Sequence, residues 1–157
     1  MKRWLVLVAV LIAAPALADT PPPVAPPGAI ALLGPVLNVG NLAAELKFYV
    51  DGLGMKQLMQ MGAPERQETM LGFAADPRAP GVILISDSTK PAQPAFDKGK
   101  GFNRLVMRVT DIAGVVARLR AMGYQASDVR DVAMGYRMAT ATDPEGYRLE
   151  LVETGKK

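Results

Sequence analysis

Two stretches of the chain, 39–56 (VGNLAAELKFYVDGLGMK) and 109–125 (VTDIAGVVARLRAMGYQ), follow one pattern. Each begins with an apolar residue that ends a strand-like run. Asn41 or Asp111 then follows as a predicted helix N-cap, and apolar residues come after it at helical spacing. Each predicted helix ends at a glycine, which suits a left-handed cap. The apolar positions coincide at an offset of 70 residues, so the chain contains an internal repeat.

Strand-like runs surround both predicted helices. We expect strands at 30–39, 55–61, 68–74 and 81–86 in the first half, and at 103–109, 125–129, 136–142 and 147–152 in the second half. The last two are joined by the turn-forming sequence Asp143-Pro144-Glu145-Gly146. The unit is therefore strand, helix and three strands, used twice. One unit leaves a sheet face uncovered, so two copies are expected to shield a concave surface with a ligand pocket between them.

The first 29 residues predict export. Lys2 and Arg3 precede an apolar run at 4–14, and Ala16-Leu17-Ala18 is a small-residue cleavage pattern. The run is shorter than the roughly 20 residues that span a bilayer, so residues 1–18 are interpreted as a signal peptide cleaved after Ala18, without a stable membrane anchor. Residues 19–29 form a proline-rich linker. The expected location is the bacterial periplasm or the exterior.

Composition excludes several classes of function. The chain has 18 basic and 15 acidic residues, and loss of the leader removes two bases, which leaves 16 minus 15, or about +1. This balance gives no support for a nucleic-acid partner. Without cysteine there is neither a disulfide nor a thiolate, and without histidine a Ser-His-Asp set is excluded.

Three segments carry a family resemblance: LNVGNLAAELKFYVDGLGMK (37–56), VTDIAGVVARLRAMGY (109–124) and DPEGYRLELVE (143–153). In their order and repetition they resemble the vicinal oxygen chelate (VOC) superfamily, which includes glyoxalase I, bleomycin-resistance proteins and extradiol dioxygenases. The resemblance covers about residues 30–153. It implies an α+β fold in which two βαβββ modules form a cup-shaped, half-barrel mixed sheet. The modules would be 30–86 and 102–153, joined by a connection at 87–101, and a homodimer is a candidate assembly.

The resemblance also implies four positions at which metal-dependent members bind one divalent ion, two in each module and typically His or Glu. In this sequence the equivalent positions are Gly34, Leu84, Arg104 and Glu150. Only Glu150 has a metal-binding side chain, since arginine is a permanent cation and the other two offer no donor. One carboxylate does not make a tight transition-metal site. We therefore predict a protein without metal or cofactor.

Three roles remain open for Arg104 and Glu150. They can form a structural ion pair. Alternatively, Arg104 binds an anionic group of a ligand while Glu150 orients it. As a third role, Glu150 is a weak candidate for a catalytic general base, because a nearby guanidinium opposes the raised pKa that this role needs. Asn38, Arg108 and Tyr136 are further ligand-binding candidates on the predicted strands.

These observations favour an exported VOC protein that binds a small organic molecule, with an anion as the candidate ligand. The alternative is a VOC-type lyase or isomerase, similar to lactoylglutathione lyase, with a degenerate metal site. A purely structural role is a third hypothesis. Met59, Met61 and Met70 leave a separate question open, because methionines either bind Cu(I) or fill gaps in a core.

Overall fold

The computed structural model describes residues 32–75, 79–90, 97–99 and 101–154. The predicted signal peptide and linker lie outside these ranges. In the described part of the chain, no helix has the length and apolar character needed to cross a membrane.

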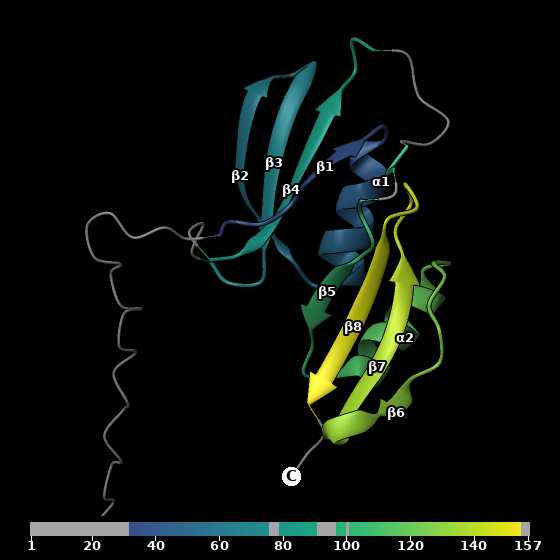
Figure 1. Cartoon of the computed structure of the whole chain (residues 1–157). Coiled ribbons are helices and arrows are strands. Elements are labelled where there is room, and N and C mark those ends of the chain that lie inside the picture. The colour runs from purple at the N-terminus through teal and green to yellow at the C-terminus, as the bar shows by residue number, and fades with distance from the viewer. Residues whose placement is uncertain (1–31, 76–78, 91–96, 100, 155–157) are drawn as a thin grey trace, which may run out of the picture. The chain divides into compact units, whose positions relative to one another are not determined.

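The first module contains one mixed sheet and one helical segment (Figure 1). Its elements are β1 (Val36–Val39), α1 (Leu42–Leu46), the π-helical turn η1 (Lys47–Gly52), β2 (Lys56–Ala63), β3 (Arg66–Gly72) and β4 (Gly81–Asp87). The strand order is β1-β4-β3-β2, with β1 parallel to β4 and the other pairs antiparallel.

The second module repeats this plan. Its elements are β5 (Leu105–Arg108), α2 (Ile112–Ala121), β6 (Arg130–Val132), the 3₁₀ turn η2 (Ala133–Gly135), β7 (Tyr136–Thr142) and β8 (Arg148–Thr154). The order β5-β8-β7-β6 and the parallel pairing of β5 with β8 match the first sheet. The predicted internal repeat is therefore confirmed as two βαβββ modules.

Both predicted helix caps are present. The Asn41 side chain accepts a hydrogen bond from the Ala44 backbone N–H, and the Asp111 side chain accepts one from Gly114, each at 3.0 Å. After α1 the chain continues as the wider π-helical turn η1, in which the N–H of Leu53 bonds to the carbonyl of Phe48, five residues earlier. Two successive aromatic residues in this wide turn, Phe48 and Tyr49, are both completely buried.

One predicted strand is displaced. In place of a strand at 125–129, the structure has β6 at Arg130–Val132 and a single bridge between Ala126 and Ala141. The Arg120 guanidinium donates two hydrogen bonds to the Ala126 carbonyl, at 3.1 and 3.0 Å. On the side facing β7, the Thr140 N–H donates to the Ser127 side chain at 2.9 Å and not to the Ser127 carbonyl, so a regular ladder begins only further along the chain.

Helices cover one face of each sheet, and the opposite face, called the open face below, has exposed side chains. In β1, Leu37 and Val39 are buried while Val36 and Asn38 are exposed, and β5 alternates in the same way. α2 lies behind β7 and β8 (Figure 1). The apolar core thus lies between sheets and helices, and the open faces remain for other contacts.

Candidate functional site

Arg104 and Glu150 form an ion pair on the open face of the second sheet. Arg104 lies just before β5, and Glu150 lies within β8 beside Val106 of β5. The Arg104 Nε and Glu150 Oε2 atoms are 2.8 Å apart, with side-chain exposures of 39% and 17%. A second guanidinium nitrogen donates to the Asn103 side-chain oxygen at 2.6 Å. The ion pair, one of the three roles that the sequence left open for these residues, is therefore present.

The first sheet offers no equivalent carboxylate, and its register corrects one assignment. Val106 pairs with Glu150 in the second sheet, and Val36, its counterpart 70 residues earlier, pairs with Ile83. Side chains alternate between the faces of a strand, so Leu84 lies on the opposite face and is completely buried in the core. The position equivalent to Glu150 is therefore Ile83 and not Leu84.

The backbone at Gly34 does not accommodate a metal-binding side chain. Its φ is +140°, a conformation that favours glycine, and a Cβ added there would lie 1.9 Å from the Gly81 carbonyl oxygen. The neighbouring Gly81 N–H donates to the Leu33 carbonyl at 2.7 Å. Close pairing of two backbone segments therefore leaves no space for a side chain at position 34.

These four positions do not fit a divalent cation. They hold a glycine, an aliphatic residue, a permanent cation, and one carboxylate that already contacts that cation. Within the described ranges, no three residues of the types His, Cys, Asp and Glu are grouped so that they could hold an ion. The side chains at this site therefore give no support to a reaction step through a bound metal.

Two of the other candidates, Asn38 and Tyr136, do not lie beside this ion pair. The Asn38 carbonyl accepts a hydrogen bond from the Tyr147 hydroxyl at 3.0 Å, while its side chain lies on the open face of the first sheet. Tyr136 begins β7. It is four residues from Thr140, the β7 partner of Glu150, and therefore roughly 13 Å along the strand.

Arg108 lines a cavity of about 430 Å³ between the two modules. Leu53 and Phe73 from the first module and Arg118 from the second also contribute to its wall. The side chain of Arg118 donates from Nε to the Gly52 carbonyl at 2.7 Å, which ties the modules together at this point. One predicted ligand-binding residue thus lines a cavity between the modules. Val115 and Arg118 of α2 also line it, so it lies beside the helix and is not the ligand pocket predicted in the concave surface.

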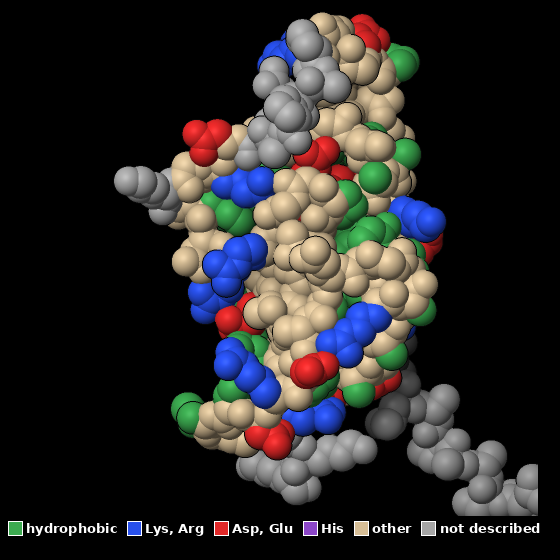
Figure 2. Space-filling view, turned by 90° about the vertical axis from the view of Figure 1, so that its right-hand side faces the viewer, with side chains coloured by type: hydrophobic (Ala, Val, Ile, Leu, Met, Phe, Trp, Pro, Cys, Tyr) green, Lys and Arg blue, Asp and Glu red, His purple; other side chains and the backbone are tan. Residues whose placement is uncertain are grey.

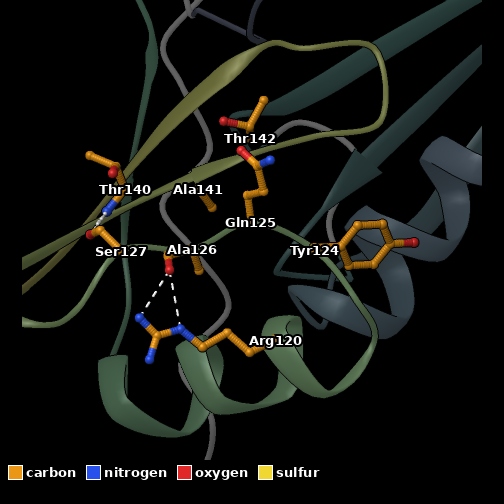
Figure 3. A pocket seen from close by; sticks show the side chains of 8 residues that line it. All are labelled: Arg120, Tyr124, Gln125, Ala126, Ser127, Thr140, Ala141 and Thr142. Atoms are coloured by element: carbon orange, nitrogen blue, oxygen red, sulfur yellow. Dashed lines mark hydrogen bonds between the residues drawn. The ribbon is translucent and has the colours of Figure 1, made fainter.

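A second cavity, of about 390 Å³, lies between the end of α2 and β7 (Figure 3). The guanidinium of Arg120 points to the Ala126 carbonyl and also contacts Asp128 at 2.7 Å. Ser127 bonds to the backbone N–H of Thr140 at 2.9 Å. The side chains of Arg120 and Ser127 thus hold the strand edge together, and the described lining residues include no paired acid and base.

A buried acidic cluster joins the modules and was not predicted from the sequence. Glu45 of α1 is completely buried, and Asp143, in the turn before β8, is 4% exposed. Asp143 accepts hydrogen bonds from the Tyr49 hydroxyl at 2.9 Å and the Tyr147 N–H at 2.7 Å. Glu45 Oε1 accepts one from the Glu145 N–H at 2.8 Å.

Burial, followed by repulsion from Asp143, raises the pKa of Glu45 to about 8. Burial raises the pKa of Asp143 as well, although its N–H and O–H donors oppose that change. Glu45 Oε2 is buried without a hydrogen-bond partner among the described residues. A proton on Glu45 removes an unsatisfied buried charge, so we assign the neutral form to Glu45 and the carboxylate to Asp143. In the sequence, the one available signal is a glutamate at helical spacing from Leu42 and Tyr49.

Basic and acidic side chains are interspersed over the face shown in Figure 2. They do not gather there into a continuous basic stripe of the kind that binds a phosphate backbone.

A sequence model of the Glyoxalase/Bleomycin resistance protein/Dioxygenase superfamily matches residues 30–151. A probable lactoylglutathione lyase from Synechocystis is 29% identical over 130 residues, covering 80% of this chain and 97% of the relative. A probable chloroplastic lactoylglutathione lyase from Arabidopsis thaliana is 30% identical over 128 residues, which are 79% of this chain. This chain spans only 36% of that relative's length.

Solved structures show the same architecture. Glyoxalase I from Zea mays superposes with a TM-score of 0.71 at 25% identity, covering 81% of this chain and 46% of the maize chain. Glyoxalase I from Leishmania major gives a TM-score of 0.67 at 24% identity, covering 80% and 87%. The predicted α+β class, with two modules in a cup-like arrangement, is confirmed.

Proposed function

Because the chain belongs to the Glyoxalase/Bleomycin resistance protein/Dioxygenase superfamily, we propose that it is an exported, metal-free protein that binds a small organic anion in its cup. The observation that carries this proposal is the guanidinium of Arg104 in contact with Glu150, at a position where metal-dependent relatives are expected to hold an ion. A fixed positive charge there selects an anionic group of a ligand.

Stability alone does not explain this pair. Its arginine is 39% exposed, and exposed ion pairs contribute about 0–1 kcal/mol to folding. The contacts with Glu150 and Asn103 use two of the three guanidinium nitrogens. Further N–H groups remain for a carboxylate, sulfonate or phosphate, which guanidinium binds with charge-assisted hydrogen bonds. Glu150 would orient the guanidinium.

The surroundings of the pair support the same ligand class. Strand alternation places Arg108 of β5 and Arg148 of β8 on the same open face, and both are exposed. Arg104, Arg108 and Arg148 carry three positive charges against the one negative charge of Glu150. The net positive charge of these four residues favours an anionic ligand.

A homodimer belongs to the same proposal. Val36 and Val106 are 54% and 61% exposed on the two open faces. A second copy that closes the cup would bury these apolar side chains and remove solvent from around the arginines.

The second candidate function is a lyase or isomerase, favoured by relatives that are named lactoylglutathione lyases. An assay for lactoylglutathione formation, with and without Zn²⁺ or Ni²⁺, separates the two proposals. Metal-stimulated turnover would support the enzyme and contradict the metal-free binding protein.

Binding is tested by the change in melting temperature with a panel of small carboxylates, sulfonates and phosphate esters. Arg104→Ala should abolish the shift given by the best compound while leaving the fold intact. Arg66→Ala is the matched control. Arg66 lies on the other sheet, and its Nε contacts the Asp87 carboxylate at 3.2 Å, so this variant also removes one positive charge and one ion pair. An equal loss in both variants, or none in Arg104→Ala, would refute the proposed site.

A further inference from the structure

The open face of the first sheet has three methionines at adjacent positions. Met59 of β2 pairs directly with Met70 of β3. Met61 lies two residues further along β2, on the same face, and pairs with Glu68. Directly opposed Cβ atoms in an antiparallel pair are about 5 Å apart and diagonal neighbours about 7–8 Å, so three long side chains can reach a common point.

These methionines do not fill gaps in the core. Met59 and Met61 are 41% and 46% exposed, and Met70 is half-buried. Ile83 and Ile85 of β4 flank Met70 and Glu68 on the same face. The three thioethers are therefore open to solvent on one side and bordered by aliphatic side chains on the other.

We propose that Met59, Met61 and Met70 bind a single cuprous ion. Thioether sulfur is a soft, neutral donor that prefers Cu(I) to hard cations, so the site needs neither histidine nor cysteine. Methionine has three rotatable bonds, which let the sulfur atoms converge without moving the sheet. The carboxylate of Glu68, exposed beside Met61, adds a negative charge that favours a bound cation.

This site is separate from the anion site proposed above, and the absence of metal proposed there concerns the Arg104–Glu150 site only. It lies on the other sheet and shares no residue with Arg104 or Glu150. Loss of one should therefore leave the other unchanged, and the two proposals can fail independently.

The test is an anaerobic titration of the full chain with Cu(I), in competition with bicinchoninate as a coloured chelator. Leucine is close to methionine in volume, so Met70→Leu and a triple Leu variant of the cluster should fold. Met134→Leu is the control, because Met134 is 89% exposed and lies outside the cluster, in η2.

We expect the wild type and Met134→Leu to bind one equivalent with the same affinity. Met70→Leu should bind at least tenfold more weakly, and the triple variant should not compete with the chelator. X-ray absorption of the wild-type complex should show sulfur neighbours only. If the wild type fails to compete, or the triple variant binds as tightly as the wild type, the proposal is wrong and the methionines form only an apolar wall.

Discussion

Glu45 gives the sharpest prediction about stability. It is completely buried in the contact between α1 and the turn that precedes β8, and Asp143 is its neighbour. Glu45→Gln keeps the side-chain volume and the oxygen that accepts the Glu145 N–H, but it removes the titrating proton. The substitution therefore separates the protonation of this group from its packing.

The magnitude follows from the pKa, which is about 8 in the folded protein against an ordinary value of 4.5. A raised pKa means that the folded state holds the proton more tightly than the unfolded state. The stabilisation is therefore complete below pH 4.5 and is lost as the pH rises through 8. One pH unit in this window corresponds to about 1.4 kcal/mol. The free energy of unfolding should fall by about 2–3 kcal/mol between about pH 5.5 and 7.5.

Urea unfolding at about pH 5.5, 6.5, 7.5 and 8.5 measures this slope. Glu45→Gln should lose most of the dependence and should be more stable than the wild type at the highest pH. A smaller slope of the same sign should remain, because the pKa of Asp143 is also raised. Glu68→Gln, which neutralises an exposed carboxylate, should keep the wild-type slope. A wild type with constant stability over the first three pH values, or an unchanged slope in Glu45→Gln, would refute the assignment of the buried proton.

Three further predictions concern single side chains. Tyr49→Phe removes the hydroxyl donor to Asp143 and should lower the free energy of unfolding by about 1–3 kcal/mol in urea, because a buried carboxylate oxygen loses its partner. Gly34→Ala should destabilise strongly, since its Cβ would meet the Gly81 carbonyl, whereas Gly101→Ala, with open space around it, should change the melting temperature little. If the proposed anion site is correct, Glu150→Gln should weaken anion binding in a calorimetric titration, because the Arg104 guanidinium loses the carboxylate that orients it, and folding stability should change by less than about 1 kcal/mol. Stronger binding in Glu150→Gln would instead show that the carboxylate competes with the ligand and does not position the guanidinium.

The parts of the fold that depend on local sequence could be predicted from the sequence. Asn41 and Asp111 bind the first turns of their helices, and the Asp143–Gly146 turn closes with a hydrogen bond between those two residues. Each signal lies within four residues of its partner. The proximity of Arg104 and Glu150 could also be predicted, because the repeat and the family resemblance place both residues at ligand positions of one module.

Features that depend on contacts between distant segments could not be predicted in the same way. The choice between Ile83 and Leu84 depends on the parallel pairing of β1 with β4, and a shift of one residue moves a side chain to the other face. The contact between Tyr49 and Asp143 joins residues 94 positions apart. A glutamate in an amphipathic helix ordinarily faces solvent, whereas Glu45 is buried against the turn of the second module that contains Glu145.

The four positions equivalent to the metal ligands of the family are unsuited to a metal ion in their backbone as well as in their side chains. A carboxylate at position 83 and a neutral ligand at position 104 would require only side-chain changes on the open faces. Position 34 is different, because the Gly81 carbonyl occupies the space that a Cβ needs. A metal site would therefore require the start of β4 to move away from the segment before β1, breaking the Gly81–Leu33 hydrogen bond. This packing constrains the first module independently of the charge on Arg104, and both features oppose a divalent ion at these four positions.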